Sequence, residues 1–206
     1  MKIILASKSP RRREILSLLN IPFEVIVSDV DESSDIKDPA LLVCELSKRK
    51  GIAVAQMKEL REKNEDHLII SSDTLVFLDG KIFGKPADTE EAKHMIGQLS
   101  GRTHSVFSGI SLISLSNNGD ICEYTDFEET KVTFSQMSEK DIDLYLSLEN
   151  VTDKAGAYAI QGAASLWIEG IVGNYYNVVG LPVNKLASLF SRAGVPIEKI
   201  MRQTAE

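Results

Sequence analysis

The segment from residue 5 to residue 13, LASKSPRRR, brings hydroxyl groups, cations and a helix start together. An apolar strand at residues 3–5 leads into it, and Ser9-Pro10 is typical of a helix start, because Ser suits the N-cap and Pro the first helical position. The unpaired N–H groups of a helix N-terminus attract anions. Three arginines in the first turn oppose the helix dipole unless an anion lies there. We therefore interpret this segment as a phosphate site, with a solvated basic helix start as the alternative.

A carboxylate follows an apolar strand near the middle of the chain. Asp73 lies in the segment SSDT at residues 71–74, directly after the predicted strand at residues 67–71. We expect it at the end of that strand, where α/β proteins place their ligands. A carboxylate there can bind Mg²⁺ or orient a water molecule. The alternative is an Asp that caps a turn.

Further polar side chains lie in predicted loops. Lys85 is held between Gly and Pro, on a stiffened backbone from which it could reach a phosphate. In residues 153–162 small residues crowd around Tyr158 and Gln161, so that backbone can approach a flat ligand closely. The Gln161 amide offers a donor and an acceptor to a base edge. The alternatives are a solvated lysine and a tightly packed turn.

The remaining titratable clusters are less specific. The acidic stretch at residues 29–32 is either a solvated loop or the source of a second carboxylate that joins Asp73 at a metal ion. The three histidines, His67, His94 and His104, have no mutual ligand spacing, so we interpret them as structural and expect no zinc site.

The elements that must position these residues mix helices with paired strands. Strands are expected at residues 3–5, 23–27, 67–71, 75–78, 81–83, 105–114, 121–134 and 163–172. Helices are expected at residues 9–19, 39–61, 88–99, 138–148 and 181–192, with a last short one after Pro196. Asp79-Gly80 predicts a hairpin, and Asp88 with Glu91 has capping-box spacing. This order favours an α/β or α+β fold with a mixed sheet.

The composition excludes several protein classes. The 206 residues suit one domain, or one domain built from two lobes, and 43% hydrophobic residues can bury a core. Lys and Arg number 23 against 30 Asp and Glu, and this net charge of −7 argues against a nucleic-acid polymer as partner.

The cysteines and the apolar runs indicate a compartment. Cys44 and Cys122 are far apart, which fits a reduced intracellular protein, with one disulfide as the alternative. No apolar run approaches the roughly 20 residues that span a bilayer. The apolar start of the chain is too short for a signal peptide. We therefore expect a cytoplasmic protein with no membrane partner.

Seven segments, taken together and in this order, resemble the Maf family of nucleoside triphosphate pyrophosphatases. They are residues 5–12 (LASKSPRR), 72–74 (SDT), 84–86 (GKP), 99–104 (LSGRTH), 154–158 (KAGAY), 160–162 (IQG) and 177–182 (NVVGLP). The resemblance covers nearly the whole chain, with Ala159 standing where the family usually has Gly. It implies one domain over residues 1–206, with a mixed α/β sheet, flanking helices and two lobes around a deep cleft, similar to inosine-triphosphate pyrophosphatases. It also implies a fold that is often found as a homodimer.

The resemblance further implies hydrolysis of a nucleoside triphosphate to the monophosphate and pyrophosphate with a divalent metal, Mg²⁺ or Mn²⁺. Residues 157–162 resemble the subgroup that acts on dTTP and UTP, while the sister subgroup prefers 7-methyl-GTP. A house-cleaning role linked to cell division would follow. By this resemblance Asp73 is the catalytic base, and the substrate-specificity positions are Arg12, Thr74 and Gln161. The remaining polar residues of the cleft are Ser7, Arg11, Glu32, Lys50 and Lys85.

Physical chemistry agrees with these roles. Attack on the α-phosphorus requires that charge on a tetra-anionic substrate be neutralised. The cations would be Arg11, Arg12, Lys50 and Lys85, together with a metal ion held by Glu32 and Asp73. Two alternatives stay open at this point. One is a nucleotide-binding regulator of septum formation without turnover, and the other is a pyrophosphatase of inosine-triphosphate or 7-methyl-GTP preference.

Overall fold

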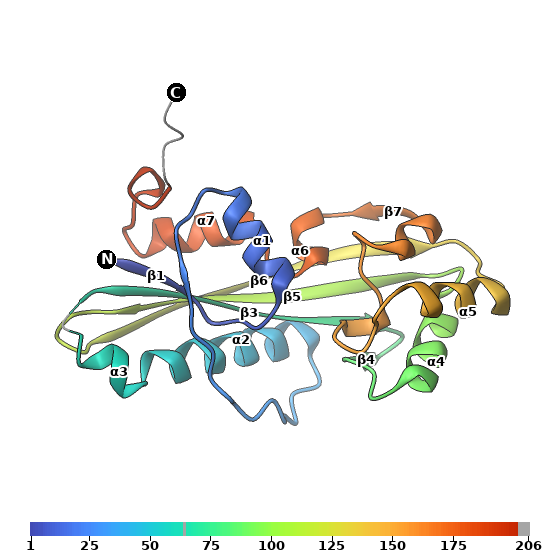
Figure 1. Ribbon diagram of the computed structural model, residues 1–206, viewed down its shortest axis with the longest axis horizontal. Helices are drawn as coiled ribbons and strands as arrows, with labels where there is room; N and C mark the ends of the chain where they lie inside the picture. Colours follow the sequence, from blue (N-terminus) through green and yellow to red (C-terminus); the bar gives the residue numbers. More distant parts are fainter. Residues whose placement is uncertain (64, 202–206) are drawn as a thin grey trace. The chain divides into compact units, whose positions relative to one another are not determined.

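The computed structural model describes residues 1–63 and 65–201, which form two compact units (Figure 1). Unit 1 comprises the described residues of Met1–Asp73, Ser108–Glu128 and Gly180–Glu206, and unit 2 comprises Thr74–Phe107 and Glu129–Val179. In the part of the chain that is described, no helix is both long and apolar enough to cross a membrane.

One mixed sheet runs through the fold. Its strands are β1 (Lys2–Leu5), β2 (Glu24–Val25), β3 (His67–Leu78), β4 (Lys81–Phe83), β5 (Thr103–Leu115), β6 (Ile121–Phe134) and β7 (Ile168–Val172). The strand order is β2-β1-β3-β5-β6-β7, and β4 pairs with β3 off this path. Strand β1 is parallel to β2 and β3, whereas the β3–β4 and β6–β7 pairs are antiparallel. The expected mixed α/β sheet is therefore confirmed.

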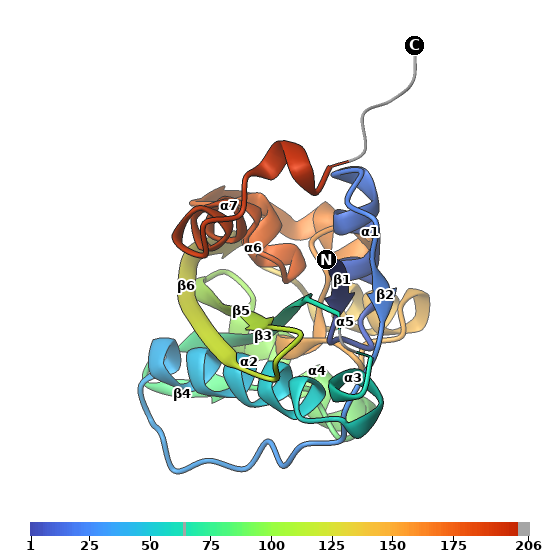
Figure 2. The same ribbon diagram turned by 90° about the vertical axis from the view of Figure 1, so that its left-hand side faces the viewer.

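The helices complete the two units. They are α1 (Pro10–Leu18), α2 (Pro39–Ala55), α3 (Lys58–Arg61), α4 (Thr89–Leu99), α5 (Glu139–Leu148), α6 (Tyr175–Val179) and α7 (Val183–Arg192). Short 3₁₀ helices are η1 (Ala155–Ala157), η2 (Ala163–Trp167) and η3 (Ile197–Lys199). Within unit 1, α2 and α3 lie on one side of the strands, and α1 and α7 lie on the other (Figure 2). Unit 2 has its own apolar core, in which α4 and α5 pack with η1.

Strand β3 corrects the expectation for Asp73. The sequence predicted a strand end at residue 71, but β3 continues without a break through residues 71–74 to Leu78. Strand β1 pairs with β3 over His67–Ile70, and β4 pairs with it over Val76–Leu78. Residues 71–75 belong to neither pairing, so Asp73 lies in the middle of an interrupted strand edge. The prediction failed because polar residues can continue a strand whose other neighbours hold it in place.

Four other features differ from the sequence predictions. The helix expected at residues 39–61 divides into α2 and α3, because the backbone at Met57 is extended and the turn buries Leu60 in the unit 1 core. The first half of the strand expected at residues 163–172 is the helix η2, since a short apolar run does not distinguish the two. Helix α6 was missed, and α7 begins at Val183 instead of residue 181.

Several local signals were confirmed. The hairpin at Asp79-Gly80 has positive φ at both residues, 50° and 78°, as a tight two-residue turn requires. Asp88 accepts a hydrogen bond from the Glu91 N–H and caps α4. Strands β5 and β6 and helix α5 match their predicted ranges within two residues.

Candidate active site

Lys50 and two carboxylates form the centre of the candidate site in unit 1. The Lys50 Nζ lies 2.5 Å from the Asp73 Oδ1 and 2.9 Å from the Glu32 Oε1. The Lys50 and Asp73 side chains are 17% and 13% exposed, whereas that of Glu32 is 53% exposed. A helix, a strand and a loop thus bring together three of the residues that the sequence singled out.

Close backbone packing places Lys50 beside β3. A Cβ at Gly51 would lie 2.7 Å from the Ser71 Oγ and 2.7 Å from an Ile113 side-chain atom. A Cβ at Gly109 would lie 2.1 Å from the Val43 carbonyl oxygen of α2. Only glycine therefore fits at these two points of contact between α2 and the sheet. The Ser71 hydroxyl donates to the Ser47 carbonyl at 2.7 Å, which fixes α2 against β3 one turn before Lys50.

The alternation of side chains along β3 separates two functions. Ser71 faces α2, and Asp73, two residues on, reaches Lys50 on the same helix. Ser72 points the other way, where its hydroxyl donates to the Gly109 carbonyl at 2.7 Å and the Gly180 carbonyl at 3.0 Å. The strand therefore presents Asp73 to Lys50, while Ser72 holds the backbone around it.

Arg12 reinforces that backbone from helix α1. Its Nε donates to the Gly180 carbonyl at 2.7 Å, and its Nη1 donates to the Ser72 carbonyl at 2.7 Å and the Ser7 hydroxyl at 3.1 Å. Burial lowers the pKa of the Arg12 guanidinium, while the nearby Asp73 carboxylate acts in the opposite direction. Arg12 therefore ties helix α1 to the backbone at residues 72 and 180.

Ser7 and Arg11 lie in the predicted phosphate segment. Ser7 is buried, and its hydroxyl accepts hydrogen bonds from the Ser9 N–H at 3.2 Å and from Arg12 at 3.1 Å. Ser9 is the N-cap residue as expected, but its side chain makes no capping hydrogen bond. Arg11 lies half-buried in the first turn of α1. The geometry groups Ser7 with Arg12, and the phosphate role of this segment stays a prediction.

In unit 2, the loop that carries Lys85 is tied to the turn at η1. The Gly84 carbonyl accepts a hydrogen bond from the Gly156 N–H at 2.9 Å. Gly156 and Ala157 both have positive φ, 66° and 61°, a conformation that is strained for alanine. Lys85 itself is exposed. Two segments far apart in the sequence therefore meet within unit 2.

The turn that carries Gln161 is held from both sides. The Glu149 carboxylate accepts a hydrogen bond from the Ala163 N–H at 2.8 Å, and the Gln161 side chain is exposed. Tyr158 is buried and bonds His104, with 2.7 Å between its hydroxyl oxygen and the His104 Nε2. Burial lowers the pKa of His104 to about 4, so this histidine is neutral and structural, as expected. Thr74 follows Asp73 in β3 and is half-buried.

Glu32 and Asp73 fit a hard divalent cation. Within residues 1–63 and 65–201, no group of three or more His, Cys, Asp or Glu side chains could hold a metal ion. Two carboxylates that converge on one point are nevertheless the donor set that Mg²⁺ uses when substrate phosphates supply further oxygens. Lys50 occupies the point of convergence, so a cation would share this site with the ammonium group.

Sequence reasoning missed two contributors. Gly180 was seen only within the segment NVVGLP, yet its carbonyl receives both Arg12 and Ser72. Arg49 was not singled out, although it contacts the loop that carries Glu32. Neither contact has a local signal, because both depend on backbone carbonyls that are distant in the sequence.

Comparisons with known proteins agree on one family. The family model described as Maf-like protein matches residues 2–193. A dTTP/UTP pyrophosphatase of Caldanaerobacter subterraneus subsp. tengcongensis is 45% identical over 93% of this chain and 89% of its own length. The dTTP/UTP pyrophosphatase of Thermoanaerobacter sp. (strain X514) is 46% identical over 93% of this chain and 96% of its own.

A solved structure is more distant. The HAM1 protein from Coxiella burnetii aligns with a TM-score of 0.42 and 16% identity, over 66% of this chain and 74% of that one. A likeness of this extent supports no conclusion about function.

Arg12→Ala should lower the free energy of unfolding by about 2–3 kcal/mol, because it leaves the Ser72 and Gly180 carbonyls without a charged donor. The control is Arg13→Ala, since Arg13 is exposed and makes one long contact of 3.4 Å to the Lys8 carbonyl. Its loss should stay within about 0.5 kcal/mol. Urea unfolding measures both values. Equal losses in the two variants would contradict the tying role of Arg12.

Proposed function

Because the chain belongs to the Maf family, we propose that it hydrolyses dTTP and UTP to the nucleoside monophosphate and pyrophosphate. The observation that carries this proposal is the cluster of Lys50, Asp73 and Glu32 at the interrupted edge of β3. It combines a cation for the phosphates with a carboxylate that can take a proton from water.

The protein residues divide the work of the reaction. Asp73 is the general base and accepts the proton of the attacking water. Lys50 keeps a positive charge beside it, where charge develops on the phosphate oxygens in the transition state. Ser72 and Arg12 hold the backbone of residues 72 and 180 in place, so that Asp73 needs little rearrangement before reaction.

A divalent cation, Mg²⁺ or Mn²⁺, completes the proposal. Glu32 and Asp73 would hold it, and it would neutralise charge on the triphosphate. We expect a metal requirement because the chain, with a net charge of −7, must bind a substrate that is itself a polyanion, and a bound cation reduces their repulsion. Loading the site requires that the Lys50 ammonium move away from the point where the two carboxylates converge.

The remaining roles rest on the match to the family. Ser7, Arg11 and Lys85 bind phosphate oxygens in this proposal. Arg12, Thr74 and Gln161 select the nucleotide. The position of Gln161 supports its role in nucleotide selection, because its side chain is exposed on a turn that Glu149 fixes in place.

We also propose that residues 1–206 act as a single catalytic domain. Strands β3, β5 and β6 pass from one compact unit into the other, so neither unit has a complete sheet without them. Cys44 and Cys122 are both free thiols, which fits the cytoplasmic location that we propose. Assembly as a homodimer stays a prediction.

Product analysis over a nucleotide panel tests the function. The purified protein is incubated with UTP, dTTP, CTP, ITP or 7-methyl-GTP, with Mg²⁺ or Mn²⁺ or with neither. The proposal expects pyrophosphate and monophosphate in equal amounts from UTP and dTTP, and no turnover without metal. Release of orthophosphate, or a preference for ITP or 7-methyl-GTP, would replace the proposal by another reaction or specificity.

Asp73→Asn should lower kcat on UTP by at least ~10²-fold, because the amide can no longer accept the proton of water. The same exchange at the end of the same strand, Asp79→Asn, is the control, since Asp79 is an exposed turn residue that pairs with Arg102. Thermal unfolding verifies that both variants are folded. Turnover of Asp73→Asn within a few-fold of wild type would end the assignment of the base.

Gln161→Ala should narrow the preference for UTP over CTP. A glutamine amide pairs with the O4 and N3–H edge of uracil, and cytosine reverses that pattern of donor and acceptor. Because the amide could rotate by half a turn to suit cytosine, a neighbour must fix its orientation, and we propose Thr74 or a backbone group for this. An unpaired polar edge costs roughly 1–3 kcal/mol, so kcat/KM for UTP should exceed that for CTP by at least ~10-fold in wild type.

Leu166→Ala is the control for this prediction, because Leu166 is exposed on η2, directly after the same turn. It should leave the ratio of the two kcat/KM values unchanged. A ratio that is equally unchanged in Gln161→Ala would defeat this form of base recognition, even if the reaction itself proved correct.

A further inference from the structure

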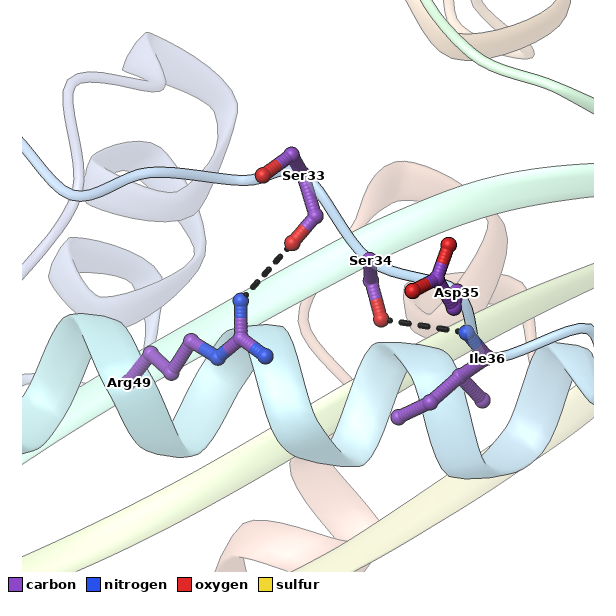
Figure 3. A pocket seen from close by; sticks show the side chains of 5 residues that line it. All are labelled: Ser33, Ser34, Asp35, Ile36 and Arg49. Carbon is purple, nitrogen blue, oxygen red and sulfur yellow. Dashed lines mark hydrogen bonds between the residues drawn. The ribbon is translucent and has the colours of Figure 1, made fainter.

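The loop at residues 29–38 carries Glu32 past helix α2 without regular secondary structure. An open depression of about 650 Å³ lies beside it, lined by Ser33, Ser34, Asp35, Ile36 and Arg49 (Figure 3). Along this stretch the loop therefore stands off from the helix, and close packing of side chains does not fix its position. Polar contacts must do so instead.

A tight turn encloses Glu32 within this loop. The Asp31 carboxylate accepts hydrogen bonds from the Ser33 N–H at 2.8 Å and from the Ser33 hydroxyl at 2.6 Å. Glu32 is the middle residue of this turn. Its local backbone is thus set, but the turn as a whole still needs an anchor.

Arg49 provides the anchor from α2. Its Nη1 donates to the Ser33 carbonyl at 3.0 Å and to the Asp31 carbonyl at 3.4 Å, one on each side of Glu32. Figure 3 shows the guanidinium reaching up from the helix to the Ser33 carbonyl. The Arg49 Nε donates in turn to the Glu45 carboxylate at 2.7 Å, one helical turn earlier. The Glu45 carboxylate on α2 therefore orients the guanidinium, which in turn holds the loop.

Two consecutive residues of one helix thus act on one loop residue. Arg49 holds the backbone on both sides of Glu32, and Lys50 contacts its carboxylate at 2.9 Å. The ion pair between Lys8 and Asp29 at the start of the loop is almost fully exposed and contributes little to the order of the loop.

We propose that Arg49 is a positioning residue, which fixes the turn at residues 31–33 so that the Glu32 carboxylate stays beside Lys50 and Asp73. This role in metal binding rests on the proposed function. Without Arg49, the entropy of ordering the loop would have to be offset by each binding event, and the cation would bind less tightly.

Binding of Mn²⁺ alone to the full chain, followed by electron paramagnetic resonance, tests this role without turnover. Arg49→Ala should weaken Mn²⁺ binding by about 10-fold, the size expected when a partner of a metal ligand is removed. Lys48→Ala is the matched control, because Lys48 precedes Arg49 on the same helix and pairs with Glu123 instead of the loop. Its Kd should stay within about 2-fold of wild type. If Mn²⁺ binding weakens equally in both variants, the loss of one positive charge explains the effect, and the proposal is overturned.

A double-mutant cycle then asks whether Arg49 acts through Glu32. If it does, Arg49→Ala should weaken Mn²⁺ binding in the wild-type background but add less than about 2-fold to Glu32→Gln. Effects that multiply in full would mean that Arg49 acts by another route, and the proposal would fail.

Amide hydrogen exchange in the metal-free protein separates this proposal from the proposed function. Arg49→Ala should accelerate exchange at residues 29–38 by about 10-fold or more, and Lys48→Ala should not. Exchange that is unchanged in Arg49→Ala refutes the anchor, whatever the protein hydrolyses. If the wild-type protein binds no Mn²⁺ and cleaves no nucleoside triphosphate, the proposed function is refuted. The comparison of exchange rates between wild type and Arg49→Ala still decides whether Arg49 anchors the loop.

Discussion

A single ammonium group, that of Lys50, joins two carboxylates that would otherwise repel each other at the edge of the sheet. Its position follows from the glycines at 51 and 109, which let α2 lie directly against β3 and β5. The alternation of side chains along β3 then places Asp73 on the face that α2 covers, beside Lys50. Backbone contacts between α2 and the sheet therefore decide whether these three charged groups meet.

The cations of this acidic chain have separate tasks. The Arg12 Nε and Nη1 donate hydrogen bonds to the Gly180 and Ser72 carbonyls, and these bonds join α1 to the backbone at both residues. Lys50 contacts one mostly buried carboxylate, that of Asp73, and one exposed carboxylate, that of Glu32. Arg49 contacts backbone carbonyls and sets the place of a loop. A count of positive residues near the site does not reveal this division, whereas their hydrogen-bond partners do.

Local chemistry explains what the sequence could predict. The Asp79-Gly80 hairpin and the cap at Asp88 depend on neighbouring residues, and both were correct. The strand end at Asp73 was wrong, because the length of β3 is set by its partners and not by its own polar residues. The pairing of Lys50 with Glu32 and Asp73 agrees with their family resemblance, but no spacing in the sequence indicates it. The roles of Gly180 and Arg49 could not be found at all, since carbonyl acceptors carry no side-chain signal.

The central claim is that the cluster of Lys50, Asp73 and Glu32 is where the nucleotide's phosphoanhydride is cleaved. The most direct test is a crystal structure of the protein with Mn²⁺ and a UTP analogue whose α–β bridge cannot be hydrolysed, with the metal located by its anomalous scattering. The account predicts Mn²⁺ in contact with the Glu32 and Asp73 carboxylates and with the triphosphate, and Lys50 displaced toward a phosphate oxygen. Nucleotide and metal bound elsewhere, with the Lys50 ion pairs intact, would contradict it.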